Sequence, residues 1–142
     1  LPICQRDGGD PEGPATPGTM KARNVLGTEL VPCSFDPLTG WYRDGCCHTD
    51  AEDQGSHVIC CKVTVGFLNN QMEAGNDLIS PRPQLRFAGL KPGDRWCVCA
   101  RRWREAMRAG QAPPVVLEST HERALQFVTL DELRAHALEP VR

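Results

Sequence analysis

The chain has 142 residues, 40% of them hydrophobic and 24% charged, which gives room for one globular domain with its own core. The formal net charge of −2 argues against a nucleic-acid-binding protein, because gripping a phosphate backbone takes many lysine and arginine contacts. No stretch approaches the ~20 apolar residues of a membrane-spanning helix and no basic-then-apolar signal peptide is seen, so we expect a cytoplasmic protein without nucleic-acid or membrane partners.

The N-terminal segment is rich in residues that resist packing. Its first twenty positions hold four prolines and four glycines. Such a composition buries too little apolar surface to offset the entropy lost on ordering. We therefore predict a flexible tail over residues 1–22 and a single globular domain over 23–142. Cys4 lies in this tail and is expected to take no part in any site.

A long loop region is predicted over residues 32–55. It is dense in turn formers, including Asp36-Pro37, Thr39-Gly40 and Asp44-Gly45. Aspartate bonds its own backbone and glycine accepts a positive φ, so the region should be structured rather than extended. Long loops inside a compact domain are often functional.

The first regular elements follow this loop. Residues 56–63 alternate as a strand does, which predicts His57 and Cys61 on one face and Cys60 on the other. A helix is then predicted over 64–74, where a glycine stops it.

The second half of the chain continues the same mixture of elements. The predictions there are a turn over 91–94, a strand over 95–100, a helix over 100–109, a strand-like stretch over 114–117, capping boxes over 119–122 and 129–132, and a C-terminal helix after the second box. This order predicts an α+β domain with a short mixed sheet, about three helices and long structured loops.

Cysteine clustering is the most informative local feature. Six of the eight cysteines fall in three tight groups, Cys46-Cys47, Cys60-Cys61 and Cys97 with Cys99. Side chains of residues two positions apart on a strand point to the same face, whereas side chains of adjacent residues in an extended chain point to opposite faces. Cys97 and Cys99 can therefore share a site, but only one cysteine of each adjacent pair joins it readily. Core packing of these cysteines is the competing interpretation.

The leading hypothesis is a cysteine-centred site that binds zinc or another thiophilic metal, or acts as a thiol redox centre. Thiols in a reducing compartment are free, ligating or redox-active, whereas in a secreted protein eight cysteines would indicate four disulfides. The spacings fit no standard zinc motif. The candidate ligands are Cys46, Cys47, Cys60, Cys97 and Cys99, with Cys33 and His48 as further candidates.

A second hypothesis is a small enzyme or ligand-binding domain in which the cysteines only pack. Histidine with a carboxylate performs acid–base work near neutral pH, and arginine binds anions. The candidates for such a cleft are Arg43, Asp44, His121 and Glu122. A third hypothesis is a structural or interaction module without a site. Substrate, small-molecule partner and oligomeric state are left open.

Several runs of the sequence resemble a family of small, mostly bacterial proteins of unknown function, domain of unknown function 2237. The longest are DPLTGWYRDGCC over 36–47 and GLKPGDRWCVCA over 89–100, within a resemblance that spans roughly 24–138. It implies little about activity. It does imply that Cys61 stands where a small residue is usual, so that Cys60 is the site member of its pair and His57 lies on the opposite face.

Overall fold

The computed structural model describes residue 4 and residues 22–85 and 87–138. The strands are β1 (His57–Lys62) and β2 (Arg95–Cys99), the α-helices are α1 (Val65–Glu73), α2 (Ala100–Arg108) and α3 (Leu130–Ala135), and three short 3-10 turns are η1 (Pro83–Leu85), η2 (Leu117–Ser119) and η3 (Glu122–Gln126). The predicted α+β class with three helices is confirmed. Most of the predicted tail over 1–22 lies outside the described residues. Within the described part, no helix has both the length and the apolar character needed to cross a membrane.

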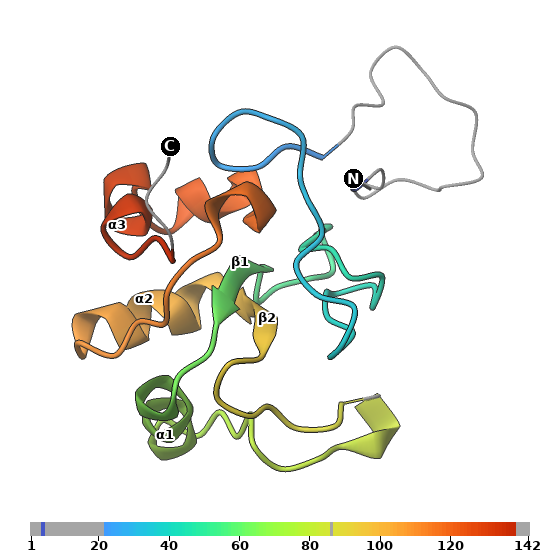
Figure 1. The fold of residues 1–142 in the computed structure, drawn as a ribbon, viewed down its shortest axis with the longest axis vertical. Coiled ribbons are helices and arrows are strands. Elements are labelled where there is room, and N and C mark those ends of the chain that lie inside the picture. Colours follow the sequence, from blue (N-terminus) through green and yellow to red (C-terminus); the bar gives the residue numbers. More distant parts are fainter. Residues whose placement is uncertain (1–3, 5–21, 86, 139–142) are drawn as a thin grey trace.

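The two strands form an antiparallel pair at the centre of the molecule, so the sheet of the described residues is antiparallel rather than mixed as predicted (Figure 1). Cys60 pairs with Cys97 and Ile59 with Val98, but the register shifts before Ile59, so that His57 pairs with Cys99. The shift is a β-bulge, which bends a strand and changes where a side chain points.

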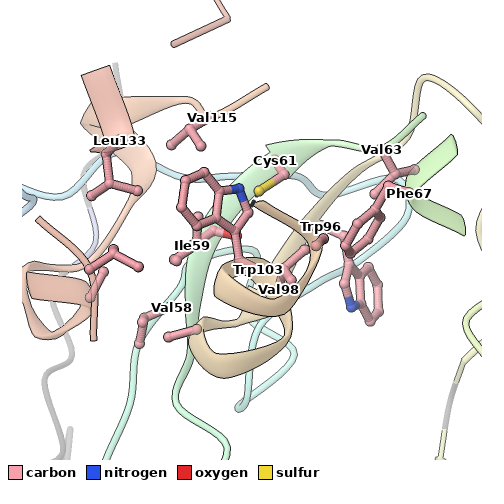
Figure 2. Packing of buried hydrophobic residues seen from close by; sticks show 14 of the residues in the cluster. Val58, Ile59, Cys61, Val63, Phe67, Trp96, Val98, Trp103, Val115 and Leu133 are labelled. Carbon is pink, nitrogen blue, oxygen red and sulfur yellow. Dashed lines mark hydrogen bonds between the residues drawn. The ribbon is translucent and has the colours of Figure 1, made fainter. Parts of the chain in front are cut away.

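Hydrophobic packing on the helix side of this pair forms the main core. Trp103 of α2 is fully buried beside Ile59 and Cys61 of β1, with Leu133 of α3 closing the cluster (Figure 2). The indole N–H of Trp103 donates to the carbonyl of Pro113 at 3.2 Å, so its one polar group is satisfied. Burying such side chains is the main favourable term in folding.

The segment 22–56 covers the opposite side of the strand pair and contains no helix or strand longer than a single bridge (Figure 1). Hydrogen bonds nevertheless connect it to the rest of the domain. The Asn24 amide donates to the Glu118 carbonyl at 3.0 Å, and the Thr39 hydroxyl accepts from the backbone N–H of Cys97 at 2.9 Å. Gly40 has φ +103°, and a Cβ there would lie 2.2 Å from the Cys46 carbonyl oxygen, so this turn requires glycine. The predicted structured loop is therefore present.

In the second half of the chain, the strand predicted from residue 95, the helix predicted from residue 100 and the C-terminal helix form as β2, α2 and α3, but two other predictions are wrong. Residues 114–117 form no strand: Val115 makes only single bridges, to Cys61 and to Ala137. The capping box predicted at 119–122 is absent because the Ser119 hydroxyl donates instead to the Pro32 carbonyl at 3.0 Å. The box at 129–132 forms as predicted and starts α3.

Candidate functional site

Four cysteines, two from the 22–56 segment and one from each strand, meet on the loop side of the strand pair. Cys60 and Cys97 are cross-strand partners, and each forms a disulfide with a loop residue, giving Cys33–Cys60 and Cys47–Cys97. All four side chains are at most 5% exposed and pack with Val116. We call these residues the four-cysteine cluster.

The two disulfides of the cluster lie against each other. The Sγ atoms of Cys33, Cys47 and Cys97 are all within 4.8 Å of one another. This trio contains both sulfurs of one disulfide and one sulfur of the other. A small movement would therefore bring a sulfur atom of one pair into bonding distance of a sulfur atom of the other pair.

The remaining cysteines separate from the cluster. Cys46 points away from its neighbour and forms a disulfide with Cys4, which joins Cys4 to the loop segment apart from the four-cysteine cluster. Cys61 is a free thiol in the helix-side core, where burial raises its pKa well above the usual range. The predicted division between Cys60 and Cys61 is confirmed, because Cys60 packs in the four-cysteine cluster and Cys61 in the helix-side core.

His48, a further ligand candidate, lies beside the Cys4–Cys46 disulfide. Its ring is 1% exposed and its Nδ1 lies 3.0 Å from the Asp44 carboxylate. Nε2 is buried without a hydrogen-bond partner among the described residues. One ring nitrogen of His48 and the Sγ atoms of Cys4 and Cys46 lie within 4.8 Å of one another, a geometry that a metal ion could use if that disulfide were reduced.

The structure overturns the predicted placement of His57. Regular alternation puts His57 on the face of Cys61, but the bulge before Ile59 reverses that alternation. His57 therefore lines the same cavity as Cys97 and Cys99. The bulge is set by backbone pairing with β2, which the residue pattern of β1 alone does not reveal.

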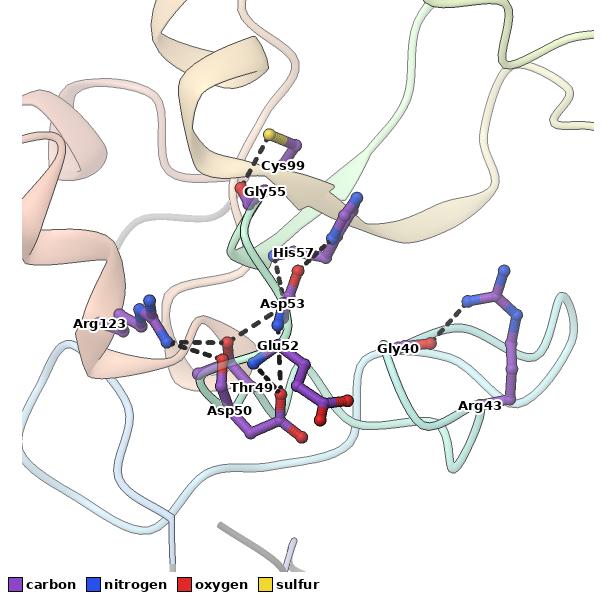
Figure 3. A network of polar contacts seen from close by, with 10 residues as sticks. All are labelled: Gly40, Arg43, Thr49, Asp50, Glu52, Asp53, Gly55, His57, Cys99 and Arg123. Atoms are coloured by element: carbon purple, nitrogen blue, oxygen red, sulfur yellow. Dashed lines mark hydrogen bonds and ion pairs between the residues drawn. The ribbon is translucent and has the colours of Figure 1, made fainter. Parts of the chain in front are cut away.

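Asp53 anchors the ring of His57. The carboxylate accepts from the His57 backbone N–H at 2.9 Å and lies 2.7 Å from the ring Nδ1, and the Thr49 hydroxyl donates to it at 3.1 Å (Figure 3). Burial of Asp53 raises its pKa, but the hydrogen bonds from His57 and Thr49 outweigh that effect, and the pKa is lowered overall. Arg123 extends the network by donating to the Thr49 hydroxyl at 3.3 Å.

Replacing this carboxylate is expected to be costly. We predict that Asp53→Ala lowers the free energy of unfolding by about 3 kcal/mol, because the donors that bond to a buried charged acceptor lose their partner. The exposed neighbour Glu52 gives a matched control, and Glu52→Ala should change stability by less than about 0.5 kcal/mol. Urea unfolding at neutral pH measures both.

The lowered pKa of Asp53 also sets a pH dependence. A carboxyl group with a depressed folded-state pKa stabilises the fold above its unfolded value, about 3.9, and loses that contribution as pH falls through the folded value. Stability of the natural chain should therefore fall more steeply below about pH 4 than that of Asp53→Ala. Parallel slopes in the two proteins would contradict the assignment.

A cavity of about 510 Å³ opens beside the cluster, a size typical of small-molecule sites. Trp41 stacks on His57 with ring centroids 5.9 Å apart, and the Arg43 guanidinium lies 5.1 Å from the centroid of Trp96. The charged lining residues are Arg43, Arg82, Arg102 and Asp77, together with the ionisable His57 and Cys99.

The polar cleft predicted from Arg43, Asp44, His121 and Glu122 is not assembled. Of these four, only Arg43 lines the cavity among the described residues. Asp44 bonds His48, and His121 caps η3 by accepting from the Arg123 backbone N–H at 3.0 Å. Asp53 was not among the predicted site residues, because in the sequence it is only one of the turn-forming residues of the loop region 32–55.

Fold and cysteine pairing together define a small α+β domain whose loop half is joined to its strand pair by disulfides. Residues 23–137 match the family described as an uncharacterized protein conserved in bacteria, domain of unknown function 2237. The match covers most of the chain, so the chain belongs to this family, as the resemblance indicated. No curated protein matches the chain.

Proposed function

We propose that the protein is a thiol–disulfide redox protein and that the four-cysteine cluster is its redox centre. The observation that carries the proposal is the contact between two disulfides, with Sγ atoms of Cys33, Cys47 and Cys97 within 4.8 Å of one another. A thiolate released from one disulfide can then attack the other, which is the geometry that thiol–disulfide exchange needs.

The chemistry of the centre is a two-electron exchange at each disulfide. A dithiol reductant transfers two electrons and two protons to Cys47–Cys97 or Cys33–Cys60, which becomes two thiols while the reductant becomes a disulfide. Both pairs join the 22–56 segment to the strands, so reduction would loosen that segment. A cytoplasmic location is part of this proposal, because glutathione and thioredoxin there would supply reducing equivalents.

Binding of a thiophilic metal such as Zn²⁺ is the second candidate function. It is favoured by the same close approach of sulfur atoms, since zinc takes four ligands and accepts an all-cysteine set. Binding would require both disulfides to be reduced and would release thiol protons.

A redox titration tests the main proposal. The full chain is equilibrated in dithiothreitol buffers of graded potential, acid-quenched and alkylated, and each cysteine is followed by mass spectrometry. The cluster disulfides should reduce with a midpoint above about −300 mV, the region below which structural disulfides of secreted proteins fall. The Cys4–Cys46 disulfide serves as an internal comparison within the same molecules.

Exchange within the cluster has its own test. In Cys60→Ser, the freed Cys33 thiol, whose Sγ lies within 4.8 Å of those of Cys47 and Cys97, should form a measurable fraction of disulfides with one of them, whereas Cys61→Ser should leave all native pairs unchanged. Reduction of all three disulfides only together with global unfolding, below about −300 mV, would assign them a purely structural role.

Zinc addition to the reduced chain separates the second candidate from the first. About one equivalent retained after desalting, lost in a Cys33→Ser and Cys60→Ser double variant but kept in Cys61→Ser, would support a metal centre. Equal retention in the two variants would contradict it.

A further inference from the structure

Cys99 and His57 meet on the wall of the cavity. They are cross-strand partners across the bulge, and a Cβ built on Gly55 would lie 2.9 Å from His57 Cε1 and 3.4 Å from Cys99 Sγ. The two side chains therefore converge over Gly55, whose carbonyl oxygen accepts from the Cys99 thiol at 2.8 Å (Figure 3). Cys99 is a free thiol and is partly exposed, so a reagent can reach it.

His57 is held in an orientation that suits proton transfer. Its Nδ1 lies 2.7 Å from the Asp53 carboxylate, which fixes the proton on that nitrogen and leaves Nε2 as the acceptor of the neutral ring. Trp41 stacks on the ring, and Asp53 is itself held by Thr49. A thiol, a histidine and an orienting carboxylate are the components of an activated cysteine nucleophile.

The cavity beside them favours a negatively charged ligand with a flat apolar body. Arg43, Arg82 and Arg102 line it beside the single carboxylate of Asp77. Arg102 also pairs with Glu105 at 3.3 Å, which still leaves an excess of positive charge. Guanidinium groups recognise carboxylates in planar geometry, and the ring of Trp41, which is 39% exposed, offers apolar surface for a flat ligand.

We propose that Cys99 is a nucleophilic thiol that exchanges with small anionic disulfides bound in this cavity. The Cys99 thiol turns from the Gly55 carbonyl and gives its proton to Nε2 of His57, and its sulfur attacks one sulfur of the bound disulfide. A new S–S bond joins Cys99 to half of the ligand, the original S–S bond breaks, and the departing thiolate takes the proton from His57. No electrons are needed from elsewhere. The step leaves the four-cysteine cluster oxidised, so it stands or falls separately from the function proposed above.

Two aromatic disulfides of different charge test the proposal. The full, oxidised chain is mixed with dithiobis-nitrobenzoate, which is dianionic, or with dithiodipyridine, which is uncharged, and release of the chromophore is followed by stopped flow. One thiol should react at least about tenfold faster than a thiol of the unfolded chain, as expected for general-base assistance. This fast phase should disappear in Cys99→Ser and persist in Cys61→Ser, the matched control for the other free thiol.

Substitutions of an arginine and of the histidine then distinguish charge recognition from proton transfer by their effects on the two probes. Arg82 is exposed, so Arg82→Gln leaves the core intact, and it should slow the anionic probe by about fivefold at low salt while changing the neutral probe less than about twofold. His57→Gln should slow both probes by at least about tenfold. Circular dichroism confirms that each variant is folded.

Three results would overturn the proposal. They are a Cys99 thiol that reacts no faster than a thiol of the unfolded chain, an equal slowing of both probes by Arg82→Gln, and probe reaction rates that His57→Gln leaves unchanged. Arg102→Gln repeats the charge test at a second position of the cavity wall.

Discussion

Removing the Cys47–Cys97 disulfide by a Cys47→Ser and Cys97→Ser double substitution is expected to lower the free energy of unfolding by about 4 kcal/mol. The two cysteines are separated by 50 positions, and a cross-link that closes a loop of this length restricts the unfolded chain by about that amount. The bond also fixes a loop segment that has almost no regular secondary structure of its own. Guanidinium unfolding followed by tryptophan fluorescence measures the change.

Cys99→Ser provides the control for this prediction, because Cys99 lies on the same strand, is partly exposed and forms no disulfide. Its effect should stay below about 1 kcal/mol. If the double variant loses less than about 1 kcal/mol, the backbone and side-chain hydrogen bonds of the 22–56 segment, rather than the disulfide, hold it in place. Reduction of the cluster would then cause little conformational change, and the redox proposal would lose its structural readout.

Trp103→Ala is expected to destabilise the protein by about 3–5 kcal/mol, the range found when a large aromatic side chain is removed from a core. Trp103 is fully buried at the centre of the helix-side core. The substitution leaves a cavity and also removes the partner of the Pro113 carbonyl. Thermal and urea unfolding measure the loss.

Trp41→Ala is the matched control for Trp103→Ala. Trp41 is 39% exposed and packs on His57 rather than in the core, so its loss should cost about 1 kcal/mol or less. Comparable losses in the two variants would mean that the cavity wall contributes as much to stability as the core, which the burial of the two side chains argues against.

Local patterns in the sequence were enough to predict most regular elements. The strand at β1 follows from alternation, and the start of α3 follows from a threonine with a glutamate three residues later. These features depend on residues within one or two turns of one another. The strand expected at 114–117 failed because its pairing depends on distant partners, Cys61 and Ala137, each of which offers only a single bridge.

The same distinction between local and long-range features applies to the candidate site. Cysteine spacing identified Cys47, Cys60 and Cys97 as candidates and placed Cys60 and Cys61 on opposite faces, because side-chain alternation is a property of the strand alone. Pairing of Cys4 with Cys46 joins positions 42 residues apart, and no local pattern encodes such a contact.

The amino-acid sequence by itself determined the class of the fold, the family and the grouping of six cysteines into three short clusters, because composition, periodicity and motif are all local properties. Only the tertiary structure decided which sulfurs meet, and it alone brought His57 and Cys99 to one cavity wall, with the buried Asp53 bonded to the His57 ring. The physical reason is the bulge in β1. One extra residue, accommodated in the pairing with β2, turns His57 to the face of Cys60, whereas regular alternation along β1 would place it on the face of Cys61.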